Sequence, residues 1–245
     1  MLRVVPSELA KGVVMWCAFA LSGVAASAAE KAIPRPEHPR PDAERAHWSN
    51  LNGSWQFRVD PKDEGLAAGW FKPDAAGFEK SINVPFGWES ELSGVHDLKY
   101  RGVAWYRRTF EVPTDFPATE RVWLRFEAVD WQSDVWVNGK KVASHAGGYT
   151  PFEADVTDAV ARGKPNTVVV RVFDPTDPSL PTGKQVGWYT STSGIWQTVW
   201  LESRPKTHIA SFAITPKIDP ASVRVEVTFA GEVGSGITLR AASSD

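Results

Sequence analysis

Residues 121 to 156 read Arg121-Val-Trp-Leu-Arg-Phe-Glu-Ala-Val-Asp-Trp-Gln-Ser-Asp-Val-Trp-Val-Asn-Gly-Lys-Lys-Val-Ala-Ser-His-Ala-Gly-Gly-Tyr-Thr-Pro-Phe-Glu-Ala-Asp-Val156, and this segment is the most informative part of the chain. The apolar residues Val122, Leu124 and Phe126 stand at every second position, which is the period of a strand with one buried face. Asn138-Gly139 separates two further alternating runs. Both residues tolerate positive φ, so the pair predicts a tight hairpin. The stretch therefore predicts consecutive antiparallel strands.

Similar short runs, bounded by Pro, Gly and Asn, recur along the chain. We expect strands at residues 54–59, 82–84, 104–112, 121–127, 134–137, 141–145, 167–173 and 198–202. One brief helix is expected at 158–162, with Gly163 as its stop. Many short strands and almost no helix predict a β-sandwich. The pattern by itself does not separate a jelly roll from an immunoglobulin-like sandwich.

The first 28 residues have the three parts of a secretory signal peptide. Arg3 and Lys11 are basic, residues 13–21 are apolar, and Ala26-Ser-Ala28 fits a small-x-small cleavage site. The apolar run is too short to span a membrane. We therefore expect export, to the periplasm or the extracellular space. Residues 29–47 are rich in proline, which predicts an extended linker.

Composition argues against several other classes of protein. Lys and Arg number 27 against 29 Asp and Glu, a net charge of −2, and no basic patch suggests nucleic acid. Cys17 is the only cysteine and lies in the expected signal, so no disulfide or thiol chemistry is expected. The histidines are isolated, and none pairs at metal-ligand spacing. We expect no metal, no cofactor and no membrane segment.

A series of short motifs occurs in one order over residues 48–204. They are Asn52-Gly-Ser-Trp55, Val84-Pro-Phe-Gly-Trp-Glu89, Ala104-Trp-Tyr-Arg-Arg-Thr-Phe110, Val135-Trp-Val-Asn-Gly-Lys140, Gly147-Gly-Tyr-Thr-Pro-Phe152 and Ser193-Gly-Ile-Trp-Gln-Thr-Val-Trp200. Together they resemble the N-terminal sugar-binding domain of glycoside hydrolase family 2, which contains β-galactosidases, β-glucuronidases and β-mannosidases. The resemblance implies a jelly-roll, galactose-binding-like β-sandwich over residues 48–204. It also implies that residues 205–245 are the opening strands of an incomplete immunoglobulin-like domain.

The resemblance further implies a sugar-binding loop from residue 174 to residue 188, because in the family one loop of this domain reaches over the catalytic barrel. The substrate-binding residues that it implies are Asp174, Asp177, Lys184, Gln185, Trp188 and Tyr189. Asp174 is the nearest match to an aspartate that contacts sugar hydroxyls in the galactosidase branch, and Asp177 is second because the loop differs in length. The alternative for Asp174 is that Asp174-Pro175 merely starts a turn.

Two positions in the Val84–Glu89 motif bear on specificity. Gly87 stands where the galactosidase branch has an asparagine, which argues against a simple galactose preference. Trp88 could stack on a sugar or close the core, and we favour the core.

A retaining glycosidase needs two carboxylates about 5 to 5.5 Å apart. The candidate acids lie on predicted turns, where we expect most of them to be solvated or to cap turns: Glu89, Glu91, Asp97, Asp130, Asp134, Asp155, Asp174 and Asp177. No spacing forces two of them together, so we predict no catalytic residue here. In the family the catalytic carboxylates lie on a later TIM barrel.

The sequence thus predicts the N-terminal, sugar-binding portion of an exported family 2 β-glycosidase that lacks the catalytic barrel. The expected partners are a β-glycoside and a family 2 barrel, supplied in the same chain or in another one. The first alternative is a stand-alone carbohydrate-binding module without catalysis, since jelly rolls often serve that way. The second is a structural or interaction domain.

Overall fold

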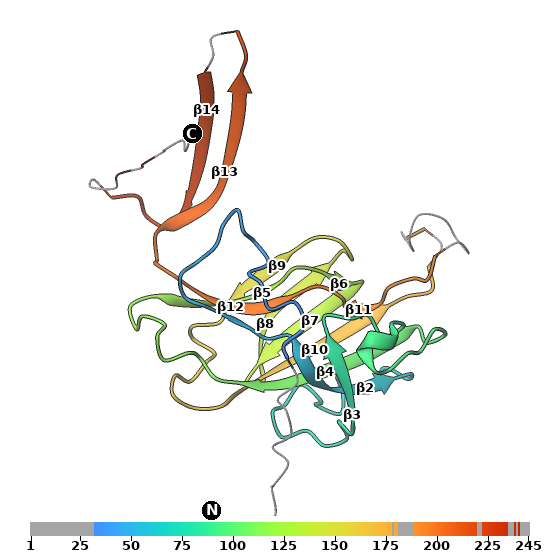
Figure 1. Cartoon of the computed structure of the whole chain (residues 1–245). Helices are drawn as coiled ribbons and strands as arrows, with labels where there is room; N and C mark the ends of the chain where they lie inside the picture. The colour runs from blue at the N-terminus through green and yellow to red at the C-terminus, as the bar shows by residue number, and fades with distance from the viewer. Residues whose placement is uncertain are drawn as a thin grey trace, which may run out of the picture. The chain divides into compact units, whose positions relative to one another are not determined.

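The computed structural model describes residues 32–177, 179–180, 189–219 and 222–234, with the single positions 238 and 240. Two antiparallel sheets face each other across the core (Figure 1). The 4-stranded sheet has the order β1 (Trp48–Asn50), β12 (Val199–Arg204), β5 (Arg121–Phe126) and β9 (Phe152–Asp155). The 6-stranded sheet has the order β3 (Lys80–Val84), β2 (Gly53–Asp60), β4 (Gly102–Phe110), β10 (Asn166–Asp174), β7 (Gln132–Val137) and β8 (Lys140–Ala146). The all-β, jelly-roll prediction is confirmed.

The core lies between the two sheets and follows the alternation of the sequence. On β5, Val122 and Leu124 are 0% exposed and Phe126 is 1% exposed. Trp55 and Tyr106 reach the same core from β2 and β4. Trp88 is also fully buried in it, which confirms the prediction that its indole closes the core.

The predicted hairpin joins β7 to β8. Asn138 has φ 51° and Gly139 has φ 81°, so both turn residues are left-handed, as a type I′ turn requires. The Asn138 side chain adds a structural role, because its Oδ1 accepts a hydrogen bond from Thr167 N at 2.9 Å. The turn is therefore fastened to the neighbouring strand β10.

A second apolar cluster covers the outer face of the 6-stranded sheet, where the loop after β2 lies against it. The rings of Trp105 and Trp136 stack with centroids 5.6 Å apart, and Phe71 from the loop stacks on Trp136 at 5.5 Å. Asp60 anchors the start of the loop, since its Oδ2 accepts from Gly65 N and from Trp105 Nε1, each at 2.9 Å. Both faces of this sheet are consequently apolar.

The structure differs from the predictions in some short elements. Residues 158–162 form turns rather than a helix, because the Asn166 side chain bonds both the N–H and the carbonyl of Ala161, at 2.7 and 3.0 Å. The strands that the sequence pattern missed are short: β1, β6 (Val129–Asp130), β9 and β11 (Gly194–Ile195). The helical turn that the described residues do contain is the 3-10 turn η1 (Glu91–Ser93).

Residues 205–245 begin with a hairpin of β13 (His208–Lys217) and β14 (Ser222–Ala230). Its apolar side chains are largely exposed, with Ile214 and Val223 each at 59% and Val225 at 43%. The expected signal peptide, residues 1–28, lies outside the described residues. In the part of the chain that the structure does describe, no helix combines the length and the hydropathy needed to cross a membrane.

The proline-rich stretch before β1 makes contacts with the sandwich. The His38 ring meets the edge of Trp48 at 4.7 Å between centroids, and Asn52 Nδ2 donates to Pro34 O at 3.0 Å. Residues near 34–38 thus follow the surface of the sandwich.

Candidate functional site

A buried polar network joins Asp174, where the predicted sugar-binding loop of residues 174–188 begins, to Ser193, which lies beyond the predicted end of that loop. Asp174 ends β10, and Ser193 immediately precedes β11. The Ser193 backbone N–H donates to Glu89 Oε2 at 3.0 Å, and the Ser193 hydroxyl lies 2.5 Å from Glu89 Oε1. The same hydroxyl also bonds Asp174 Oδ2. All three residues are at most 9% exposed.

The proton count of this network is informative. A serine hydroxyl carries one proton, yet the Ser193 oxygen bonds two carboxyl groups. One of those bonds therefore needs a proton from a carboxyl group. Burial raises the pKa of Glu89 and also that of Asp174, although the hydrogen bonds from Ser193 oppose the rise in both cases. The network is suited to hold a proton between the two carboxyl groups.

Arg101 supplies the positive charge of the network. Its Nη1 lies 3.0 Å from Glu89 Oε1, and its Nε lies 3.6 Å from Asp174 Oδ2. The guanidinium also donates to Ser191 Oγ and, at 2.5 Å, to Tyr100 O. Arg101 thereby connects the segment before β4 to Asp174 and to Ser191.

Asp130 is a third carboxyl group in the same place. It lies on β6 and is 7% exposed, and its backbone pairs with Gly194 of β11. Burial, followed by the charges of Asp174 and Glu89, raises the pKa of Asp130 to about 7, while Arg101 acts in the opposite direction. No described residue donates a hydrogen bond to this carboxyl group. Within the part of the chain that the structure describes, it is the acid of the site that has neither a hydrogen-bond donor nor an ion-pair partner.

A glycine and two aromatic rings border Asp130. A Cβ atom at Gly148 would lie 2.5 Å from Asp130 Cγ, so only glycine leaves room for the carboxyl group. Trp196 Nε1 donates to Gly148 O at 2.8 Å, and the Trp196 ring meets that of Tyr149 edge-on at 5.6 Å. Tyr149 is 54% exposed. A carboxyl group beside an accessible aromatic face can bind both the hydroxyls and the apolar side of a sugar.

The sequence-predicted residues have different surroundings. Asp174 lies in the network, where its carboxylate accepts a hydrogen bond from Ser193 and is paired with Arg101. Asp177 is exposed, and its Oδ1 accepts from Ser179 N at 2.9 Å and from Ser179 Oγ at 2.7 Å, contacts that lower its pKa. Tyr189 is 58% exposed. The remaining three, Lys184, Gln185 and Trp188, lie outside the described residues.

The sequence predicts most of the eight candidate acids to be solvated or to cap turns, and three of them are exceptions. Glu89, Asp130 and Asp174 are buried, because strands far apart in sequence bring them together around Ser193. Sequence reasoning also missed Arg101 and Ser193 as site residues. Glu89 and Ser193 do stand inside the quoted motifs, so their motif positions were the available signal.

The Gly87 position has a structural reason to stay small. A Cβ atom there would lie 3.0 Å from Thr192 Cγ2 and 3.1 Å from the Ser193 carbonyl. A larger side chain at position 87 would therefore press on the segment that follows the loop.

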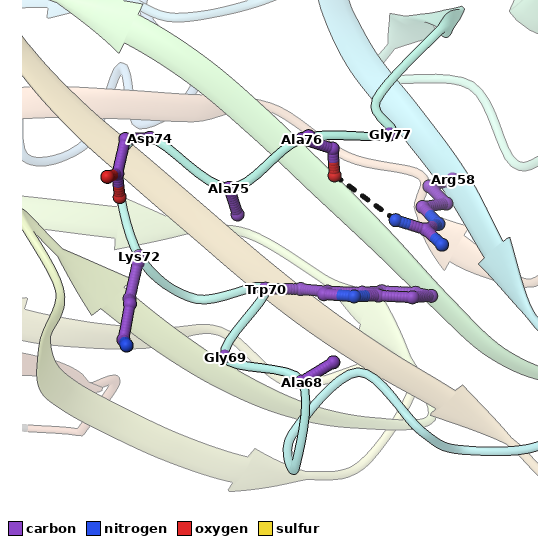
Figure 2. Close-up of a pocket in the computed structure, with 9 residues that line it drawn as sticks. All are labelled: Arg58, Ala68, Gly69, Trp70, Lys72, Asp74, Ala75, Ala76 and Gly77. Atoms are coloured by element: carbon purple, nitrogen blue, oxygen red, sulfur yellow. Dashed lines mark hydrogen bonds between the residues drawn. The ribbon is translucent and has the colours of Figure 1, made fainter.

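Two further crevices lie near other elements of the fold. Figure 2 shows one of about 480 Å³, in which the Arg58 guanidinium lies over the Trp70 ring. Its Cζ is 3.3 Å from the ring centroid, and Nη1 donates to Ala76 O at 3.1 Å. Arg58 thus holds the loop of residues 68–77 against the sheet. No cluster of three or more metal-ligating side chains occurs among the described residues.

A second hollow of about 500 Å³ lies beside β5, β12 and β13. Its buried charges are mutually paired: Arg204 Nη2 lies 2.6 Å from Glu153 Oε2, and Arg204 Nε contacts Glu202. Arg45 also lines this hollow and donates to Ile209 O at 3.0 Å, and Trp123 Nε1 and Arg125 Nε have no hydrogen-bond partner among the described residues.

Comparison with known proteins gives a consistent picture. The family model described as "Glycosyl hydrolases family 2, sugar binding domain" matches residues 48–205. A putative beta-glucuronidase of Formosa agariphila is 30% identical over 187 residues, which are 74% of this chain and 21% of that protein. A beta-galactosidase of Thermoanaerobacter pseudethanolicus is 34% identical over 198 residues, 78% of this chain and 26% of that protein.

Among solved structures, the β-glucuronidase from Ruminococcus gnavus in complex with D-glucuronic acid has a TM-score of 0.65 and 26% identity. That likeness covers 78% of this chain and 36% of the other. The chain therefore spans about a fifth to a third of the length of the relatives it matches.

Proposed function

This chain belongs to glycoside hydrolase family 2 through its sugar-binding domain, and on that premise we propose that it is the N-terminal, sugar-binding portion of an exported family 2 β-glycosidase. Its task would be to bind a β-glycoside at the face that contains Asp130, Asp174 and Tyr149. The hydrolysis of the O-glycosyl bond would be performed by a catalytic barrel, supplied in the same chain or by a partner chain. Export would depend on residues 1–28.

The single observation that supports this role best is the buried network itself. Ordinary turns do not need three carboxyl groups and a guanidinium in one buried place, because each buried charge costs free energy unless it is paired. The network includes Asp174, where the resemblance begins the sugar-binding loop, and also Ser191 and Ser193, which follow that loop in the sequence. Tyr149 and Tyr189, each more than half exposed, add aromatic faces suited to a sugar.

The test is a titration of the purified chain with methyl β-glycosides, followed by saturation-transfer NMR. Binding that weakens when Tyr149 is replaced by Ala, but not when the exposed Tyr189 is replaced, would place the sugar at Asp130. The opposite result would place it on the predicted loop. No saturation transfer to any glycoside would contradict the proposed sugar-binding role.

Export has its own test. We expect expression in a bacterium with a periplasm to yield a chain that begins at Ala29, as N-terminal sequencing would show. An uncleaved chain in the cytoplasm would contradict the export part of the proposal.

A further inference from the structure

The charged groups of the site bear on which class of sugar it could bind. Glu89, Asp130 and Asp174 lie together, and Arg101 is the one cation that the described residues bring to them. Arg101 is already paired with Glu89 and Asp174. Asp130 is consequently left without a counter-ion or a hydrogen-bond donor among the described residues.

Asp130 is 7% exposed as a residue, yet neither of its carboxyl oxygens is among the fully buried side-chain atoms that lack a hydrogen-bond partner. The carboxyl group is therefore still within reach of a ligand that could complete its hydrogen bonds. The hydroxyls of a sugar can do so, because a carboxyl group accepts two hydroxyl donors well. Gly148 supports this reading, since any side chain at that position would occupy the space of the carboxyl group.

Resting on the proposed sugar-binding function, we propose that Asp130 is a specificity-determining residue that makes this face select neutral glycosides over glycosides of uronic acids. A neutral sugar would stack on Tyr149 and donate a hydroxyl to Asp130. A uronic acid would bring a further carboxylate to a place that already has an excess of them. Repulsion between like charges a few ångströms apart is strong where water is partly excluded.

The preference for neutral glycosides over glycosides of uronic acids should depend on pH. The pKa of Asp130 is raised to about 7, so the group is mostly neutral at pH 6 and mostly ionised at pH 8. The groups that face Asp130 are Glu89, Asp174, Arg101 and Tyr149. Tyr149 stays neutral throughout this range, because burial raises its pKa from 10.0. The repulsion of a uronate should therefore grow as the pH rises.

The experiment titrates the full chain with methyl β-D-glucopyranoside, methyl β-D-galactopyranoside and methyl β-D-glucuronide at pH 6 and pH 8, with ligand-observed NMR as the readout. At pH 8 at least one neutral glycoside should bind about tenfold or more tightly than the glucuronide. The ratio of the neutral-glycoside affinity to the glucuronide affinity should be smaller at pH 6. Equal or tighter binding of the glucuronide at pH 8 would overturn the proposal.

Variants separate this role from a general effect on the fold. Asp130→Asn keeps the shape and the ability to accept a hydrogen bond but removes the charge. It should weaken the binding of the neutral glycoside, because a neutral amide accepts a hydroxyl less strongly than a carboxylate, improve that of the glucuronide, and abolish the pH dependence of the ratio of the two affinities. Asp134→Asn is the control, since Asp134 lies on the neighbouring strand β7 and is paired with Lys141 at 2.7 Å. It should leave the ratio unchanged.

The outcomes distinguish this inference from the proposed function. If all glycosides bind and Asp130→Asn leaves their ratio unchanged, Asp130 does not set specificity, although the sugar-binding role stands. If no glycoside binds, the proposed function itself fails and this inference fails with it. Should Asp130→Asn not fold, the ratio of the parent chain at the two pH values still decides the matter.

Discussion

The Ser193 hydroxyl is hydrogen-bonded to the carboxylate of Asp174, although 19 residues separate them in the chain. The contact joins the last residue of β10 to the residue before β11. It places the stem of the predicted sugar-binding loop inside the sandwich, on a network that continues to Glu89 and Arg101.

Replacement of Ser193 by alanine should destabilise the fold. The substitution removes the hydroxyl that bonds both Glu89 and Asp174 and leaves two buried carboxyl groups without that partner. We expect a loss of about 1 to 3 kcal/mol in the free energy of unfolding, measured by urea denaturation. Ser179→Ala, at an exposed position, is the control. Equal stability of the two variants would show that the network is not a structural support.

Asp174 and Asp177 should respond differently to substitution. Asp174→Ala removes a buried acceptor from Ser193 and Arg101, so the melting temperature should fall. Asp177→Ala changes an exposed carboxylate that bonds only its own turn, so the melting temperature should hardly change. In a full-length homologue, a loss of kcat/KM on replacing the residue that matches Asp177, at unchanged melting temperature, would make that residue the sugar ligand. Unchanged kinetics for it would return the role to Asp174.

The pKa of Asp130 predicts a pH dependence of stability. Its folded-state pKa is raised from 3.8 to about 7, so the folded state keeps a proton that the unfolded chain releases near pH 4. The contribution of this group to stability is therefore greatest below about pH 4 and declines as the pH rises to about 7. Asp130→Asn should gain about 1 to 4 kcal/mol over the parent at pH 8 and almost nothing at pH 4. Thermal melts at both pH values measure this, and an equal difference at the two would speak against a raised pKa.

Gly65 should tolerate no side chain. A Cβ atom there would lie 2.6 Å from Trp105 Nε1 and 2.6 Å from Trp70 Cε3. Gly65→Ala should cost about 1 to 3 kcal/mol by overpacking, as chemical denaturation would show. Gly234→Ala is a matched control, because a Cβ atom at that position meets nothing within 4 Å. Comparable stabilities would mean that the loop can move away from the sheet at little cost.

Hydrogen exchange should divide the chain into two regions. The amides of β5 and β7 belong to the interior of the sandwich and should exchange slowly. The residues of β13 and β14 have mostly exposed side chains, so their amides should exchange quickly. Mass spectrometry of deuterated peptides measures the contrast. Similar protection in both regions would show that the hairpin is supported as well as the sandwich.

The strands could be predicted from the sequence, because alternation is a local property. Val122, Leu124 and Phe126 reveal their buried face without reference to any distant residue, and Asn138-Gly139 reveals its turn in the same way. The helix predicted at 158–162 failed for a non-local reason, since the Asn166 side chain takes the backbone groups of Ala161.

The site could be predicted only in part, because its contacts are long-range. Glu89 and Ser193 are 104 residues apart, and the residues around each of them do not indicate that the two side chains are in contact. Asp130 follows an alternating strand, so its sequence position is typical of a turn residue. In the structure it pairs with β11 and is buried. The family resemblance singled out Asp174 as a candidate, whereas its hydrogen-bond and ion-pair partners follow from the fold.

The stacked indoles on the outer face of the 6-stranded sheet have a spectroscopic consequence. The Trp105 and Trp136 rings are 5.6 Å apart and inclined by only 24°, close enough for their electronic transitions to couple. Such a pair should produce an exciton signal in the circular dichroism of the folded chain. Since Phe71 of the covering loop stacks on the same Trp136, the signal would report whether that loop is docked. The chain thus contains an optical probe of its own, separate from the proposed sugar-binding face and free of any added label.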